Sequence, residues 1–178
     1  MRTIPAHGIY VSCLASYNNG DLYGIWIDLD GLDKEDILEQ IKGMIERSPT
    51  PGAEEYAVHD YSGIPGLAFG EYPNWDRLVN YVAGRNRCSG LVEEEAWSFY
   101  GQAFHNLEFR DFQEDYRGCY DAAAEYAMSC FEDDETLKQL NPVLMNSIHW
   151  DEVFDEMRCA GDIWSAYGKH GLHVFSNR

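Results

Sequence analysis

Residues 9–45, IYVSCLASYNNGDLYGIWIDLDGLDKEDILEQIKGMI, decide the first part of the fold. The segment from Ile9 to Tyr17 is rich in residues that favour strands, and the segment from Leu22 to Leu29 has the same character. Between them, Asn19 and Gly20 tolerate the positive φ angles of a two-residue hairpin turn. We therefore expect two antiparallel strands joined by a tight turn.

A helix is expected after this hairpin. Asp33 is a favourable N-cap residue, and Asp36 lies in the first turn, where the helix dipole favours an acidic side chain. The apolar residues that recur at helical spacing are Ile37, Ile41, Met44 and Ile45. Residues 48–52, SPTPG, end the helix, and residues 56–61 predict a third strand. The first part of the chain therefore predicts a β-β-α-β unit.

The remaining sequence predicts more helices and a second hairpin. Asn74 is expected to cap a short helix ending at Gly84, and Ser89 to cap another from residue 91 to about residue 102. Further helices are expected at residues 107–117, ended by Gly118, at 121–131, capped by Asp121, and at 149–159, with Pro142 separating a short helix from the last one. Residues 163–167 and 172–175 predict strands joined by a turn at 168–171.

The expected fold is α+β, an elongated chain of three small domains. These are an N-terminal β-β-α-β domain (1–62), a helical middle domain (63–106) and a C-terminal acidic domain of helices plus a β-hairpin (107–178). A chain of 178 residues is long enough for such a division.

Charge is the strongest functional signal. The chain holds 31 acidic and 13 basic residues, which gives a net charge of −18. There are 11 acidic and 4 basic residues in 1–62, 5 and 3 in 63–106, and 15 and 6 in 107–178, so the acidity is not confined to a tail. This field repels free nucleic acid and attracts a basic protein groove. We expect no direct nucleic-acid binding; charge kept for solubility alone is the alternative.

Many of the acidic residues share helix faces. Glu108, Asp111 and Asp115 are spaced i, i+3, i+7. Like charges at such spacings destabilise a helix, which indicates that the negative surface itself is useful, although a merely solvated face is the alternative. The candidate partner-binding carboxylates are Glu108, Asp111, Glu114, Asp115, Asp121, Glu125, Glu132, Asp133, Asp134, Glu135, Asp151, Glu152, Asp155 and Glu156.

Signals for catalysis or metal binding are weak. The segment 28–39 superficially resembles a calcium loop, but Asp33 stands where that loop needs glycine. His170 and His173 flank a predicted turn without the further ligands of a zinc site. The sequence has no nucleophile motif, phosphate-binding loop or dinucleotide fingerprint. We expect neither enzyme activity nor a cofactor. A small Mg²⁺-dependent hydrolase is the alternative, disfavoured because the chain lacks a basic patch to hold DNA.

The expected location is the cytoplasm. The five cysteines are odd in number and none is closely spaced with another, which is typical of reduced thiols. The first residues lack the apolar stretch of a signal peptide, and no apolar run approaches the roughly 20 residues that span a bilayer.

Four segments together resemble one known family. They are IYVSCLASYNNG (9–20) with GIWID (24–28), HDY (59–61) with GIP (63–65), FQEDYRG (112–118) with Tyr120, and HVF (173–175) with Asn177. This pattern resembles the ArdA-type antirestriction proteins of plasmids and conjugative transposons, and it covers nearly the whole chain.

The resemblance implies a homodimer that inhibits type I restriction-modification enzymes. Such a protein acts as a DNA mimic in the DNA groove of the methyltransferase and specificity core. Two copies would carry the charge of about 60 Å of duplex, which has one charge per ~1.7 Å of axis. The resemblance assigns the mimic role to Asp111, Glu114, Asp115, Asp121 and Glu125, whereas the acids at 132–135 rest on charge alone. An acidic adaptor or antagonist of another basic DNA-binding protein is the alternative.

Overall fold

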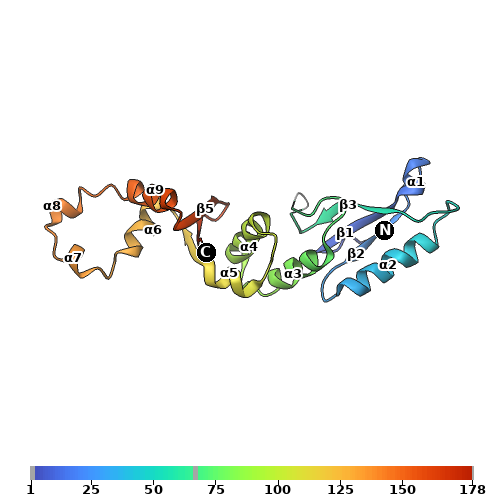
Figure 1. Cartoon of the computed structure of the whole chain (residues 1–178), viewed down its shortest axis with the longest axis horizontal. Helices are drawn as coiled ribbons and strands as arrows, with labels where there is room; N and C mark the ends of the chain where they lie inside the picture. Colours follow the sequence, from blue (N-terminus) through green and yellow to red (C-terminus); the bar gives the residue numbers. More distant parts are fainter. Residues whose placement is uncertain (1–2, 66–67, 178) are drawn as a thin grey trace. The chain divides into compact units, whose positions relative to one another are not determined.

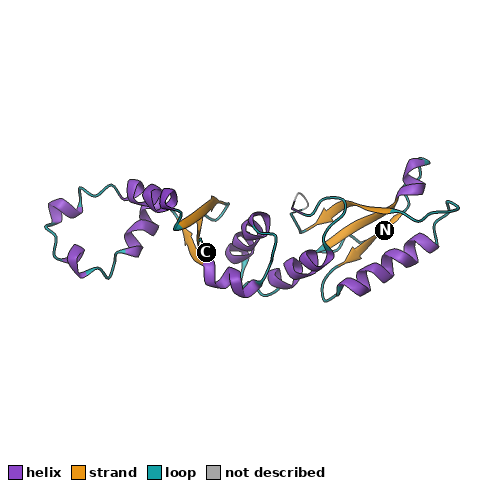
Figure 2. Cartoon of the chain, in the orientation of Figure 1, coloured by secondary structure: helices purple, strands orange, loops and turns teal. Residues whose placement is uncertain are grey.

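The structure is a computed structural model that describes residues 3–65 and 68–177. It confirms the α+β class, with two antiparallel three-stranded sheets and several helices (Figures 1 and 2). The chain divides into two compact units, Met1–Phe109 and Arg110–Arg178. The finer division into three domains remains a prediction. No helix in the described ranges combines the length and apolar character needed to cross a membrane.

The sheet of the first unit has the strand order β2-β1-β3. Strand β1 (Gly8–Cys13) is antiparallel both to β2 (Gly24–Asp28) and to β3 (Tyr56–Ser62), with an irregularity after Tyr10 in the pairing with β3. The three strands predicted for the first part of the chain are therefore confirmed.

The connection between β1 and β2 is not the expected tight turn. A short helix, α1 (Leu14–Asn18), follows β1 directly. The hydroxyl of Ser16 is buried and lies 3.1 Å from the hydroxyl of Ser48 and 2.9 Å from that of Thr50. These contacts hold residues 14–18 against the loop after the next helix, so the strand cannot continue to residue 17.

Helix α2 (Lys34–Glu46) contacts β1 and β2 and begins as predicted. The Asp33 carboxylate accepts a hydrogen bond from the backbone N–H of Asp36 at 2.9 Å, and the Asp36 carboxylate accepts one from the backbone N–H of Asp33 at 3.3 Å. This reciprocal capping satisfies two N–H groups that a helix start leaves open. The buried face consists of Ile37, Ile41 and Met44.

Two further helices complete the first unit: α3 (Trp75–Arg85) and α4 (Leu91–Ala103). Asn74 caps α3 through its side chain, as predicted. Ser89 does not cap α4, because the residue after it takes the N-cap position. The backbone N–H and hydroxyl of Ser89 instead donate to the carboxylate of Glu93 at 2.6 and 2.7 Å.

Helices α3 and α4 pack through reciprocal glycine–aromatic contacts. The Trp97 ring of α4 lies against Gly84 of α3, where an added Cβ would overlap it. The Tyr81 ring of α3 lies against Gly101 of α4, where an added Cβ would come within 2.7 Å of it. The Trp97 indole N–H also donates to the backbone carbonyl of Tyr81 at 2.8 Å. Close approach of the two helices therefore depends on glycine at both positions.

The sheet of the second unit has the order β4-β6-β5. The expected C-terminal hairpin is confirmed as β5 (Ile163–Tyr167) and β6 (Leu172–Ser176). The helix expected at 107–117 is shorter: α5 (Phe109–Asp115) ends where β4 (Tyr116–Tyr120) begins. Gly118 therefore does not end a helix; with φ of 127° it lies at an irregularity in the β4–β6 pairing.

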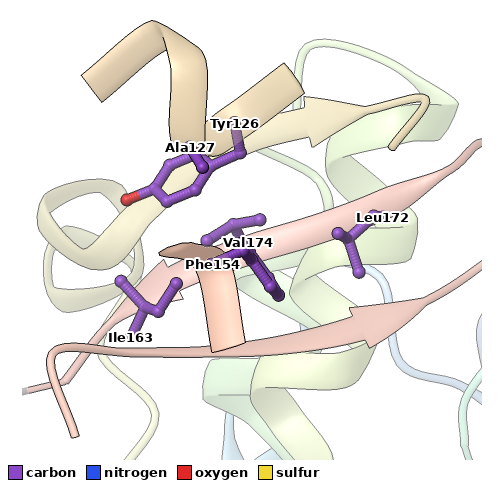
Figure 3. Close-up of a cluster of buried hydrophobic side chains, with 6 residues drawn as sticks. All are labelled: Tyr126, Ala127, Phe154, Ile163, Leu172 and Val174. Atoms are coloured by element: carbon purple, nitrogen blue, oxygen red, sulfur yellow. The ribbon is translucent and has the colours of Figure 1, made fainter. Parts of the chain in front are cut away.

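Two helices cover this sheet, α6 (Ala123–Cys130) and α9 (Trp150–Ala160). Asp121 does not cap α6, whose N-cap is Ala122 and has no side-chain bond. Between them the chain carries two single turns, α7 (Glu135–Lys138) and α8 (Pro142–Met145) (Figure 1). Figure 3 shows the core cluster of this unit: Tyr126, Ala127, Phe154, Ile163, Leu172 and Val174.

Candidate functional site

Helix α9 carries four of the predicted carboxylates on a face that core packing holds in place. Its inner face contributes Phe154, which is 3% exposed, to the core cluster, and Val153 and Met157 pack against the same cluster. Its outer face carries Asp151, Glu152, Asp155 and Glu156, all exposed. These residues form like-charged i, i+4 pairs about one helical turn apart. The core on one side thus fixes a negative surface on the other.

The acidic run that leads into the first residue of α7 is also exposed but partly structural. Glu132, Asp133, Asp134 and Glu135 all face solvent. The Asp134 carboxylate accepts hydrogen bonds from the backbone N–H groups of Thr136 and Leu137 at 2.8 and 2.9 Å, so it caps α7. The other three carboxylates leave this part of the chain strongly negative.

Asp121 and Glu125 lie close together at the start of α6. Both are exposed, and the Glu125 carboxylate accepts a hydrogen bond from the backbone N–H of Asp121 at 2.8 Å. This bond does not replace the cap expected of Asp121, because the N–H that it satisfies lies before the N-cap residue Ala122. Both carboxylates still add charge at a helix start, where the helix dipole favours it.

The four acids around α5 do not form the expected helix face. Glu108 is exposed but precedes the helix and belongs to the first unit. Asp111 is half-buried, and Glu114 is exposed, 2.9 Å from Arg110. Asp115 is only 3% exposed, because it stands where the chain passes from α5 into β4. A carboxylate buried in this way adds no solvent-facing charge for a partner.

Basic residues neutralise little of the negative charge of the second unit. From residue 110 to 178 the sequence has 14 acidic and 6 basic residues. Lys138 lies 3.4 Å from Asp133 and 3.5 Å from Glu135, and Arg158 lies 3.9 Å from Asp155. These pairs are exposed, and such pairs contribute roughly 0–1 kcal/mol each. They leave the carboxylates accessible to a stronger cationic partner.

Some acidic residues of the first unit connect its elements. The Asp30 carboxylate accepts a hydrogen bond from the Asn86 side chain at 2.9 Å and lies 2.9 Å from the ring of His7. The hydrogen bond from Asn86, and after it the interaction with His7, hold the pKa of Asp30 below its ordinary value. Glu94 similarly pairs with Arg85 at 2.9 Å.

The two histidines considered as zinc ligands do not come together as a metal site. His173 is fully buried in β6, 3.1 Å from the hydroxyl of Tyr116 and 4.0 Å from the thiol of Cys119. His170 is exposed, and its backbone carbonyl accepts a hydrogen bond from Cys119. Within residues 3–65 and 68–177, no group of three or more His, Cys, Asp or Glu side chains is placed to hold a metal ion.

An apolar pocket beside the acidic run is absent from the sequence predictions. It has a volume of about 340 Å³, and its apolar lining comes from Met128, Phe131, Leu137, Met145 and Trp150. A second pocket of about 180 Å³ shares three of these residues and adds Ile148 and Val153. The lining residues come from four short elements, so no single periodic pattern in the sequence marks them.

Comparison with known proteins supports one family. A family model described as antirestriction protein (ArdA) matches residues 9–170, which run from β1 through β5. A search of curated proteins found no match.

Proposed function

Because the chain belongs to the ArdA family of antirestriction proteins, we propose that it inhibits type I restriction-modification enzymes by DNA mimicry. The family is one of inhibitors rather than enzymes. In this mechanism, exposed carboxylates replace phosphates in the DNA-binding groove of the methyltransferase and specificity core, and duplex DNA is excluded.

The outer face of α9 is the observation that carries this proposal. Its four carboxylates are exposed, and a packed core fixes the helix beneath them. A flexible acidic tail would have to be ordered on binding, whereas this surface is already ordered. Carboxylates one turn apart, at about 5.4 Å, are sparser than the phosphates of one DNA strand, at about 3.4 Å. Mimicry therefore requires several acidic elements together.

The proposed mimic surface extends beyond α9. In the second unit it includes half-buried Asp111 and the other exposed carboxylates at Glu114, Asp121, Glu125, Glu132, Asp133, Asp134 and Glu135, while exposed Glu108 of the first unit is a separate candidate. We leave out Asp115 because it is buried. We further propose that a homodimer in the cytoplasm presents this surface, since one chain alone carries the charge of only about 30 Å of duplex.

A competition experiment tests the proposal. The purified protein is titrated into a type I methyltransferase bound to a labelled duplex that contains its recognition sequence. We expect displacement of the duplex, with an affinity that falls steeply as salt rises, as it does for phosphate contacts. Binding to the DNA-saturated enzyme with unchanged affinity would contradict mimicry. An antagonist of a different DNA-binding protein would show no affinity for the methyltransferase at any salt concentration.

A further inference from the structure

The apolar pocket between α6 and α9 lies within an unusually apolar part of the surface. Met128 and Phe131, which both line it, are 52% and 36% exposed. The Phe131 and Trp150 rings, 5.9 Å apart, line both this pocket and its smaller neighbour. Exposed apolar surface of this kind marks a binding site more often than it serves the isolated chain.

The charge around the pocket indicates what it binds. Glu132 lines it, the acids 133–135 follow directly along the chain, and Asp151 and Glu152 follow Trp150. Lys138 is the basic residue of the lining, and it already lies near two carboxylates of the acidic run. A second copy would bring the same negative rim against this one, which costs free energy. A basic protein would meet complementary charge.

We propose that the pocket receives an apolar side chain, flanked by Lys or Arg, from the basic protein that the carboxylates bind. This inference rests on the proposed function and adds a contact that duplex DNA does not offer. Charge pairs across the interface weaken as salt screens them, whereas burial of an apolar side chain does not depend on that screening. The pocket therefore gives the inhibitor a salt-resistant part of its affinity, beyond the phosphate-like contacts.

Two pocket variants and one control test this inference. Leu137→Ser and Met145→Ser each remove an apolar lining side chain that lies outside the core cluster. Val143→Ser removes an apolar side chain of the same segment that does not line either pocket. The dissociation constant for a type I methyltransferase is measured from about 50 to 200 mM salt.

We expect each pocket variant to weaken binding about tenfold at every salt concentration, because each removes buried apolar contact with the partner. The slope of log affinity against log salt should match that of the unaltered protein, because no charge is removed. Val143→Ser should bind as the unaltered protein does. Circular dichroism and thermal melting verify that all three variants are folded.

The outcomes separate this inference from the proposed function. If the pocket variants bind like the control, the pocket proposal is wrong, whereas displacement by duplex would still support mimicry. If duplex does not displace even the unaltered protein, both proposals are wrong. If sedimentation shows that the pocket variants lose a dimer that the control retains, a second copy occupies the pocket and the proposed occupant is wrong.

Methionine methyl groups give a second measurement that needs no substitution. With ¹³C-labelled methyl groups, the resonances of Met128 and Met145 should shift when the methyltransferase is added, because both residues line the pocket. Met44, on the buried face of α2 in the first unit, is the internal control and should keep its environment. Unchanged Met128 and Met145 resonances in a formed complex would contradict the inference.

Discussion

At the level of single residues, the acidic side chains divide by what they contact. Asp33 and Asp134 cap helices, and Asp30 connects three segments of the first unit. Asp115 is buried at the end of α5, whereas Glu156 on α9 faces solvent. Net charge therefore overstates the charge offered to a partner, and substitution of a capping residue would confuse stability with binding.

Replacement of Asp30 by Asn should reduce stability near neutral pH but not in acid. The folded chain lowers the pKa of Asp30, so the charged carboxylate stabilises the fold. This stabilisation is complete above the unfolded pKa of about 3.9 and is lost as pH falls through the lower, folded pKa. Because the Asp30 side chain is 42% exposed, we expect a difference below about 1 kcal/mol.

Urea unfolding of both proteins across this pH range measures the effect. The difference in unfolding free energy between Asp30→Asn and the unaltered chain cancels the contributions of the other titrating groups. A difference that persists unchanged at the lowest pH would show that the hydrogen bonds of Asp30 do not depend on its charge.

At the level of elements, the same substitution should have opposite effects on stability at two helical glycines, one in the α3–α4 contact and one in α2. Gly84→Ala should destabilise the chain by about 1–3 kcal/mol, because the added methyl group would overlap the Trp97 ring. Gly43→Ala in α2 should stabilise it by about 0.5–1 kcal/mol, because its Cβ would meet only the flexible end of Arg47, at 3.4 Å. Urea denaturation measures the change in unfolding free energy for each variant, and two changes of the same sign would contradict the packing described.

The four carboxylates of α9 should contribute to binding together rather than singly. Neutralising Asp151, Glu152, Asp155 and Glu156 together, with Asn and Gln, should lower affinity for a type I methyltransferase and flatten its salt dependence. Asp151 and Glu152 lie in the first turn of α9, where the helix dipole favours acids, so loss of that interaction should offset the relief of repulsion and leave stability nearly unchanged. Each single neutralisation should cost little, and one that abolished inhibition would contradict distributed mimicry.

A matched control for this variant lies in the same unit. Gln139 and Asn146 are exposed polar residues between α7 and α9, and replacing both by Ala removes no charge. Binding and salt dependence should then remain as in the unaltered protein. Displacement of labelled duplex provides the measurement for both variants.

Elements that depend on local signals could be predicted from the sequence. Asp33 with its helix, Asn74 with α3 and the hairpin of β5 and β6 follow from caps, periodicity and turns close in the chain. The end of β1 and the strand β4 could not, because they depend on distant partners. Tyr116 has helical spacing from Phe112, yet in the fold it pairs with Phe175.

The candidate site was predictable in charge but not in geometry. Composition and spacing place most of the carboxylates on exposed turns and helix faces, as the structure does. Burial of Asp115 depends on where β4 begins, which local spacing does not reveal. The pocket is formed by single apolar residues such as Leu137 and Met145 from separate short helices, so it has no signature in the sequence.

At the level of the whole molecule, salt should act in opposite directions on folding and binding. A net charge of −18 repels itself in the folded chain, and ions screen that repulsion. Raising sodium chloride from about 50 to 200 mM should therefore raise the melting temperature of the free protein while it weakens the complex. Thermal melting and titration measure the two effects, and a melting temperature that falls with salt would contradict the first.

The two faces of α9 also couple the target to the interior of the inhibitor. A cationic partner relieves repulsion among the outer carboxylates, and by linkage a ligand that binds only the folded state opposes unfolding. Phe154, on the inner face, shares the core cluster with Val174 of β6. Amide hydrogens of β6 should then exchange more slowly in the complex, although the partner need not touch that strand. The inhibitor would accordingly resist proteolysis best while it holds its target, and would be cleared most readily once released.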